Sequence, residues 1–124
     1  MNRGDAFYPK VGPGKFHIWV VLSEEEGRKV VCANFTSMGA SLEDRTCVVE
    51  ASDYSELSHR SCVVYEAARL IPVSEIERWI SCGMAEYRRP VSEDVLEAMV
   101  DGALVSDLIA VDLSALLERQ RNAS

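Results

Sequence analysis

The sequence predicts an α+β fold, in which a small antiparallel β-barrel or strongly curved sheet is followed by two or three helices. Five short runs rich in β-branched and aromatic residues fall within the first 65 residues, and turn-forming residues separate them. Such a density of short strands is typical of a small barrel. Beyond residue 73, apolar residues recur with helical spacing. We therefore expect one domain over residues 1–124, mainly β over 1–73 and mainly helical over 74–124.

The clearest element is a β-hairpin. Two strand-length apolar runs, residues 18–22 and 30–35, flank a charged connector that contains Gly27. This pattern predicts antiparallel strands joined by a hairpin turn or a short loop, whose acidic residues 24–26 are solvated. The start of the first strand then lies beside the end of the second, so His17 should meet the polar residues that end the second strand. These residues are Asn34, Thr36 and Ser37.

The remaining strands are short. Residues 3–9 predict a first strand that Pro9 closes, because proline donates no hydrogen bond to a ladder. Residues 46–50 and 62–65 predict two more strands, and the stretch up to Pro72 allows another. The Gly-rich residues 10–15 predict a loop, which serves as a turn or lies over a ligand.

Three helices are expected after these strands. Ser74 and Glu77 have the spacing of a capping box, and Gly83 suits the position just beyond the helix end. Ser92 is a good N-cap for a second helix over 92–103. A third helix is expected over 112–121.

Composition excludes several classes of protein. The net charge of −7 opposes nonspecific nucleic-acid binding, although residues 1–23 are basic and residues 91–124 acidic. No apolar run is long enough to span a bilayer, and the N-terminus has no signal-peptide core, so we expect a cytoplasmic protein. The four cysteines have no metal-ligand spacing, so no metal site or other cofactor is expected. We expect Cys32, Cys47 and Cys62 to be buried and reduced.

Several short motifs, taken in order, resemble the PemK/MazF toxins. They are an Arg-Gly-Asp opening, a Gly-Pro-Gly-Lys loop, a strand that ends at Ser23, a strand that ends Phe-Thr-Ser37, and a Ser-Cys-Val-Val-Tyr65 strand before a capped helix. The resemblance covers about residues 3–85. It departs from the family where His17 replaces the usual Arg, and where Ile18 and Asn34 stand in place of prolines.

The resemblance implies an SH3-like barrel, a homodimer, an antitoxin protein as partner, and cleavage of single-stranded RNA. It assigns the site to the residues that match the family's motifs, which are Arg3, Asp5, Lys15, His17, Thr36 and Ser37.

The residue types suit metal-free RNA cleavage. That reaction needs a base for the 2′-OH, an acid for the leaving oxygen and donors for the charged phosphorane. We expect His17 to act as base or acid, Thr36 and Ser37 to hold phosphate oxygens, and Arg45 or Arg60 to stabilise charge. The other candidate contacts to RNA are Asn34, His59 and Ser61.

Structural roles for the same residues stay open. His17 is about as well explained as a strand-end residue bonded to a neighbouring backbone group, and His59 as a turn residue. Arg3 and Asp5 can form an ion pair or cap the first strand. Trp19 and Trp79 are expected in a core or an interface. The alternative function is a non-catalytic SH3-like barrel that binds a protein partner.

Overall fold

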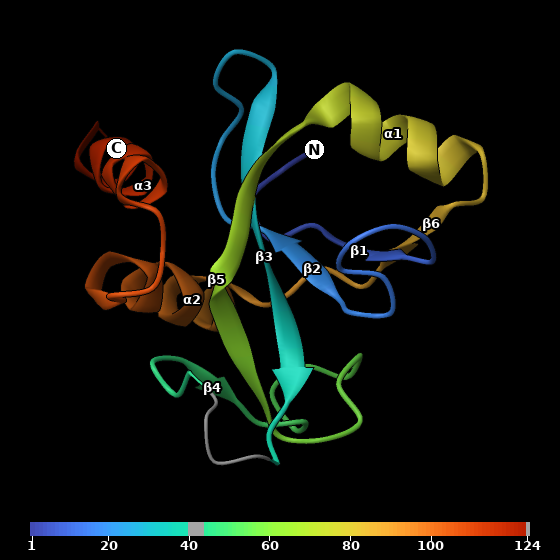
Figure 1. Cartoon of the computed structure of the whole chain (residues 1–124). Coiled ribbons are helices and arrows are strands. Elements are labelled where there is room, and N and C mark those ends of the chain that lie inside the picture. Colours follow the sequence, from blue (N-terminus) through green and yellow to red (C-terminus); the bar gives the residue numbers. More distant parts are fainter. Residues whose placement is uncertain (40–43, 124) are drawn as a thin grey trace.

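The computed structural model describes residues 1–39 and 44–123, which form a six-stranded antiparallel sheet and three helices (Figure 1). The strand order is β4-β5-β3-β2-β1-β6. The strands are β1 (Ala6–Pro9), β2 (Trp19–Val21), β3 (Lys29–Ser37), β4 (Val48–Val49), β5 (Ser61–Pro72) and β6 (Ala85–Arg88). The helices are α1 (Val73–Ser81), α2 (Glu93–Val105) and α3 (Val111–Ala123). The predicted α+β class is confirmed.

The predicted hairpin is formed by β2 and β3. The strands pair antiparallel, with Trp19 opposite Asn34 and Val21 opposite Cys32. Gly27 and Arg28 both have positive φ and lie between Glu26 and Lys29, which exchange backbone hydrogen bonds. This is a two-residue type I′ turn, whose twist matches that of the strands.

The sheet is open in the described part of the chain, so a closed barrel is not confirmed. Its outer strands, β4 and β6, pair only with β5 and β1, respectively. Closure requires the two outer strands to pair with each other. β4 has two residues and β6 has four, so they offer few backbone groups for that pairing. The density of short strands in the sequence therefore predicts a sheet of several strands, but it does not predict whether that sheet closes into a barrel.

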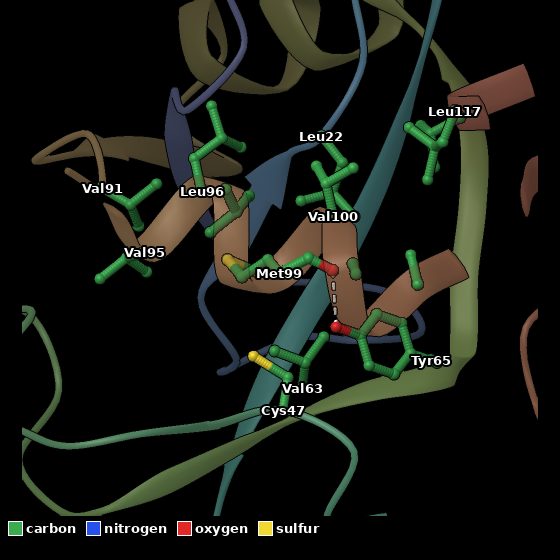
Figure 2. Close-up of a cluster of buried hydrophobic side chains, with 14 of the residues drawn as sticks. Leu22, Cys47, Val63, Tyr65, Val91, Val95, Leu96, Met99, Val100 and Leu117 are labelled. Atoms are coloured by element: carbon green, nitrogen blue, oxygen red, sulfur yellow. Dashed lines mark hydrogen bonds between the residues drawn. The ribbon is translucent and has the colours of Figure 1, made fainter. Parts of the chain in front are cut away.

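One face of the sheet packs against α2 and α3, which lie on the same side of the long β3 and β5 strands in Figure 1. The strands contribute mainly Val20, Val31, Ala33, Val63 and Tyr65 to this core, together with Leu22 directly after β2. The helices contribute Leu96, Met99, Val100, Leu113, Leu116 and Leu117. Figure 2 shows the centre of this core, where the Tyr65 hydroxyl donates to the Met99 carbonyl oxygen at 2.6 Å.

The opposite face carries a second, smaller core under α1. Phe7, Trp19, Val21, Val30, Cys32 and Ile71 of the sheet pack there with Val73 and Ile76. Trp19 is only 2% exposed, and its ring stacks on that of Phe7. The partly buried Trp79 packs at the margin of this core. Both tryptophans therefore have the packing role expected of them.

The helix ends agree with the sequence at two of three places. Ser92 caps α2, because its Oγ accepts from the backbone N–H of Val95. Gly83 has a φ of +75° and donates to Ile80, while Met84 donates to Trp79, which is the Schellman pattern that ends α1. The predicted capping box at Ser74 is wrong, because α1 begins at Val73 with Pro72 as its N-cap. Ser74 already lies inside the first turn.

β5 and β6 differ from expectation in extent. β5 is one strand of 12 residues where the sequence indicated two pieces, and it ends at Pro72 as expected. β6 was not predicted. It pairs with β1 from Ala6 opposite Arg88 to Pro9 opposite Ala85, so it depends on a partner about 80 residues away in the chain.

The predicted burial of three of the four cysteines is confirmed. Cys32, Cys47 and Cys62 are buried, Cys82 is exposed, and none of the four forms a disulfide. Burial raises the pKa of the Cys32 thiol strongly and that of Cys47 also. None of the helices in residues 1–39 and 44–123 is both long and apolar enough to cross a membrane.

Candidate functional site

His17 lies beside the end of β3, as the antiparallel hairpin predicts. Its Nδ1 is 3.0 Å from the carbonyl oxygen of Phe35, and the backbone N–H of Phe35 donates to the carbonyl of Ile18. Because a carbonyl oxygen can only accept, Nδ1 carries the proton in this contact. In the neutral imidazole, Nε2 then has the free lone pair. The contact therefore fixes both the ring and the tautomer that can take up a proton.

Three open hollows adjoin one another along this end of the sheet, and we call them together the furrow. The first is lined by the loop 12–15 with His17, Trp19, Asn34, Glu66, Ala67 and Arg69. The second shares His17 and is lined by Tyr8, Phe16, Ile18, Phe35, Thr36, Ser37, Ser61 and residues 56–58. The third shares Ser37 and is lined by Met38, Gly39, Arg45, His59 and Arg60. His17 thus stands where the first two hollows meet.

In the first hollow, the Gly-rich loop is fixed against the sheet. The Trp19 indole donates from Nε1 to the Gly14 carbonyl at 3.0 Å, and the Arg69 guanidinium lies 5.3 Å from the centre of the Trp19 ring. Gly14 has a φ of +80°, and a Cβ there would collide with the indole. Only glycine permits this close approach, so the loop holds Lys15 beside His17 in the same hollow.

Asn34 is the buried polar residue of this hollow. It is 5% exposed, and its Oδ1 has no hydrogen-bond partner among the described residues. A buried amide oxygen without a partner is unusual and costs free energy. Asn34 faces the same side of the sheet as Trp19, which lies directly opposite it. The unsatisfied acceptor therefore marks this hollow as a place where a donor from a ligand would be stabilised.

A bulge in β5 brings further charge to the first hollow. In the ladder between β3 and β5, Cys32 pairs with Arg69 and Asn34 pairs with Val64. The single residue Ala33 of β3 therefore lies opposite four residues of β5, 65–68, which form the bulge. Bulges bend a strand and redirect its side chains. Here Glu66 lies within the bulge, Arg69 follows it directly, and both line the hollow.

The second and third hollows hold most of the other predicted residues. Thr36, Ser37 and Ser61 line the second, and the Ser61 hydroxyl donates to the carbonyl of His59 at 2.9 Å. Arg45, His59 and Arg60 line the third. Arg60 is partnered there, because its Nε lies 2.7 Å from Glu50 Oε2.

Two predicted residues lie elsewhere. Arg3 lines a small cavity of about 160 Å³ between the hairpin, α2 and α3, and its Nε donates to the Leu22 carbonyl at 3.4 Å. Asp5 accepts from the backbone N–H of Asn2 at 2.8 Å. The Asp5 contact matches the capping role left open by the sequence, and the structure does not bring either residue into the furrow.

The sequence reasoning missed Arg69 and Glu66, together with the aromatic residues Tyr8 and Phe16. The signal for the first two was the pair of charges inside the apolar stretch 61–72, which an uninterrupted buried strand does not accommodate. Phe16 has a φ of +65° and is 60% exposed, both unusual for a bulky residue.

The furrow differs in charge from the whole chain. Its lining has four cations, Lys15, Arg45, Arg60 and Arg69, against the carboxylates of Glu56 and Glu66. The whole chain has a net charge of −7. The cations therefore lie in the first and third hollows at the two ends of the furrow, whereas the middle hollow contains Glu56 and no cation; the furrow also includes both histidines.

Among the described residues, His, Cys, Asp and Glu side chains do not gather in groups of three or more that would hold a metal ion. The side chains that line the furrow offer proton transfer by the imidazole of His17 and charge stabilisation by guanidinium and ammonium groups. A comparison with protein-family models finds no match for the chain, and a comparison with curated proteins finds none either.

Proposed function

We propose that the furrow binds single-stranded RNA and that the chain cleaves it as a toxin-like endoribonuclease without a metal ion. The observation that carries the proposal is the position of His17. Its Nδ1 is anchored on the Phe35 carbonyl, so Nε2 is the proton acceptor. Lys15 and Arg69 line the first hollow beside it, and Arg45 and Arg60 line the third hollow farther along the furrow. Cations at both ends of an open furrow, with the rings of Tyr8 and Phe16 between them, suit a flexible polyanion with exposed bases.

The proposed reaction is an internal transfer within RNA. His17 Nε2 takes the proton of a 2′-OH, and the 2′ oxygen forms a bond to the adjacent phosphorus. The bond from phosphorus to the 5′ oxygen breaks, and that oxygen takes a proton from solvent in the open hollow. The products are a 2′,3′-cyclic phosphate and a 5′-OH. Thr36 and Ser37 would donate to the phosphate oxygens, and Arg45 would stabilise the developing charge.

The resemblance to the PemK/MazF toxins extends this proposal. It adds an antitoxin protein that covers the furrow, a homodimer, a cytoplasmic location, and an SH3-like barrel of which the open sheet is a divergent form. The shared elements that support it are the hairpin, the Gly-rich loop and the Thr36-Ser37 strand end.

Two variants of His17 test the proposal. In His17→Asn, the amide nitrogen replaces Nδ1 as the donor to Phe35 but no base remains, whereas His17→Ala removes both functions. Catalysis by His17 predicts that both variants cleave a fluorescent single-stranded RNA about 10²- to 10⁴-fold more slowly, in the presence of a chelator. RNA binding should change little in His17→Asn. Wild-type rates in that variant would show that His17 has only a structural role.

A second candidate function is a non-catalytic module that binds a protein partner. The net charge of −7 favours it, because the acidic surface outside the furrow repels RNA. Induced expression in growing cells separates the two functions. Growth arrest by the wild type and not by His17→Asn supports the nuclease, and normal growth with abundant folded wild-type protein supports the binding module.

A further inference from the structure

A deeper cavity adjoins the furrow on the α1 side of the sheet. It has a volume of about 340 Å³ and shares Gly12, Pro13, Trp19 and Arg69 with the first hollow. This is within the size range of small-molecule sites. The two spaces are therefore neighbours, with Arg69 bordering both.

The walls of this cavity are apolar and aromatic. Phe7 and Trp19 line the sheet side, and Trp79 of α1 lines the other. Trp79 is the more accessible of the two tryptophans, since Trp19 is 2% exposed and is covered by the Arg69 guanidinium. Val11, Leu70 and Met84 also line it and are 49%, 39% and 37% exposed, respectively. These side chains surround a space suited to a flat, weakly polar group.

Two charged side chains in the lining can form hydrogen bonds with a ligand in the cavity. Arg69 supplies guanidinium donors, and Glu75 in the first turn of α1 supplies carboxylate acceptors. Guanine matches this pair, because its O6 and N7 accept and its N1–H and amino group donate. The other three bases do not offer both an acceptor edge for arginine and a double donor for a carboxylate.

We propose that this cavity receives an unstacked guanine from the RNA strand that lies in the furrow. The proposal rests on the function proposed above and adds a base preference to it. Single-stranded RNA is commonly recognised by splaying out a base onto aromatic side chains and arginine. Because Arg69 borders both spaces, a base in the cavity leaves its sugar and phosphate at the first hollow, near Lys15 and His17.

The test measures binding of labelled RNA hexamers to the His17→Asn protein, which does not cleave them under the proposed mechanism. The probes are hexauridylate and the same strand with one central G, A or C. We expect the G-containing strand to bind roughly tenfold to a hundredfold more tightly than hexauridylate. That advantage should disappear when Trp79→Ala is added and remain with Trp79→Phe, which keeps an aromatic face.

Two further variants separate a base contact from a folding defect. Glu75→Gln, at a partly exposed position in the first turn of α1, should lower the preference for G while leaving hexauridylate binding unchanged. Tyr87→Ala is the matched control, because Tyr87 is an aromatic residue with 56% exposure that lines neither the cavity nor the furrow. It should keep the full preference.

The outcomes distinguish this proposal from the function on which it rests. Equal binding of all four strands, with His17-dependent cleavage intact in the wild type, overturns the guanine site alone. An equal effect of Trp79→Ala on all four strands overturns it also. A wild-type protein that neither binds nor cleaves any of the strands overturns the proposed function, and the guanine site with it.

Discussion

Gly102 is the residue whose replacement should disturb the larger core most directly. It lies in α2 against the ring and hydroxyl of Tyr65, and a Cβ there would overlap the hydroxyl oxygen. The Gly102→Ala variant must therefore displace Tyr65 or the helix. We expect it to lose about 1–3 kcal/mol of unfolding free energy, which denaturant titration measures.

Tyr65→Phe provides the matching control. It removes the hydroxyl that donates to Met99 and should cost about 1 kcal/mol by itself. Because the same hydroxyl is what the new Cβ strikes, the two substitutions should be less than additive in the double variant. Full additivity would show that the collision at Gly102 does not determine the loss.

The four cysteines should divide into one reactive thiol and three protected ones. Cys82 is exposed at the end of α1, whereas the other three are buried. For Cys32 and Cys47, burial also raises the pKa and so lowers the thiolate fraction. A colourimetric disulfide reagent at pH 8 should titrate one thiol quickly in the native protein and all four after unfolding. Cys82→Ser should remove the fast phase, and persistence of that phase would contradict this assignment.

At the scale of elements, α3 is fastened to the β2–β3 turn. The Gln120 amide accepts from the backbone N–H of Glu24 and donates to the Glu24 carbonyl and to Glu26 Oε2. Arg119 Nη2 lies 2.6 Å from Glu26 Oε1. We call these contacts the α3 latch. Residues 24–26 are exposed, as expected of a solvated turn, but the sequence did not predict these contacts to α3.

The latch should weaken in acid. The hydrogen bond from Gln120, followed by that from Arg119, lowers the pKa of Glu26 below its ordinary value of 4.5. A carboxylate with a lowered pKa in the folded state stabilises the fold above its ordinary pKa and loses that contribution as the pH falls through the folded-state value. Hydrogen exchange of α3 amides should therefore accelerate below about pH 4.5 relative to α2. Gln120→Ala should accelerate the exchange of α3 at pH 7 and reduce its dependence on pH. Equal pH responses in the two proteins would contradict the role of the latch.

The two ends of α1 predict opposite mutational results. Ser74 makes no capping hydrogen bond, so Ser74→Ala should change the unfolding free energy by no more than a few tenths of a kcal/mol. Gly83 has a left-handed backbone, so Gly83→Ala should cost about 1–2 kcal/mol. Thermal denaturation of both variants checks the contrast. A large loss at Ser74 would mean that the capping box forms.

Local patterns in the sequence predicted the elements that depend on neighbouring residues. Apolar runs around Gly27 predicted the hairpin, and Ser92 and Gly83 predicted helix ends, because each signal acts within a few residues. The sequence did not predict β6, because its four residues become a strand by pairing with the distant β1 and have no strand-like composition of their own. The capping box failed because β5 runs without a break to Pro72, so α1 starts two residues too early for Ser74 to be its N-cap.

The candidate site was predictable to a similar extent. The antiparallel geometry of the hairpin placed His17 beside the end of β3, where Asn34, Thr36 and Ser37 also lie. Arg69 reaches the same region only through the bulge opposite Ala33. Residues 65–68 include no glycine, proline or other turn-forming residue that would mark the bulge in the sequence. The position of Arg69 could therefore be seen only in the structure.

At the scale of the whole molecule, the separation of charge should govern RNA binding. Each phosphate contact by a lysine or arginine adds about 0.7 to the slope of log affinity against log salt concentration for a single strand. The four cations of the furrow therefore set an upper slope of about 3. Lys15→Gln should lower the slope by about 0.7, as measured by fluorescence anisotropy between 50 and 300 mM salt, a range chosen to span ordinary ionic strength.

Arg121→Gln is the matched control for this measurement. Arg121 is an exposed cation of α3 that pairs with Asp101 and lies outside both the furrow and the deeper cavity. Its loss should leave the salt slope unchanged. Equal effects of the two substitutions would mean that RNA senses only the total charge of the protein.

The α3 latch also bears on the order in which the protein can fold during synthesis. Its hydrogen bonds join groups 93 to 96 residues apart in the chain, so the turn at residues 24–26 is complete on the ribosome long before its partners exist. The hairpin can form early from contacts close in sequence, while α3 can dock only after residue 120 has left the exit tunnel. Until then the apolar side chains that α3 covers remain in water, and a nascent-chain chaperone would find its binding surface there.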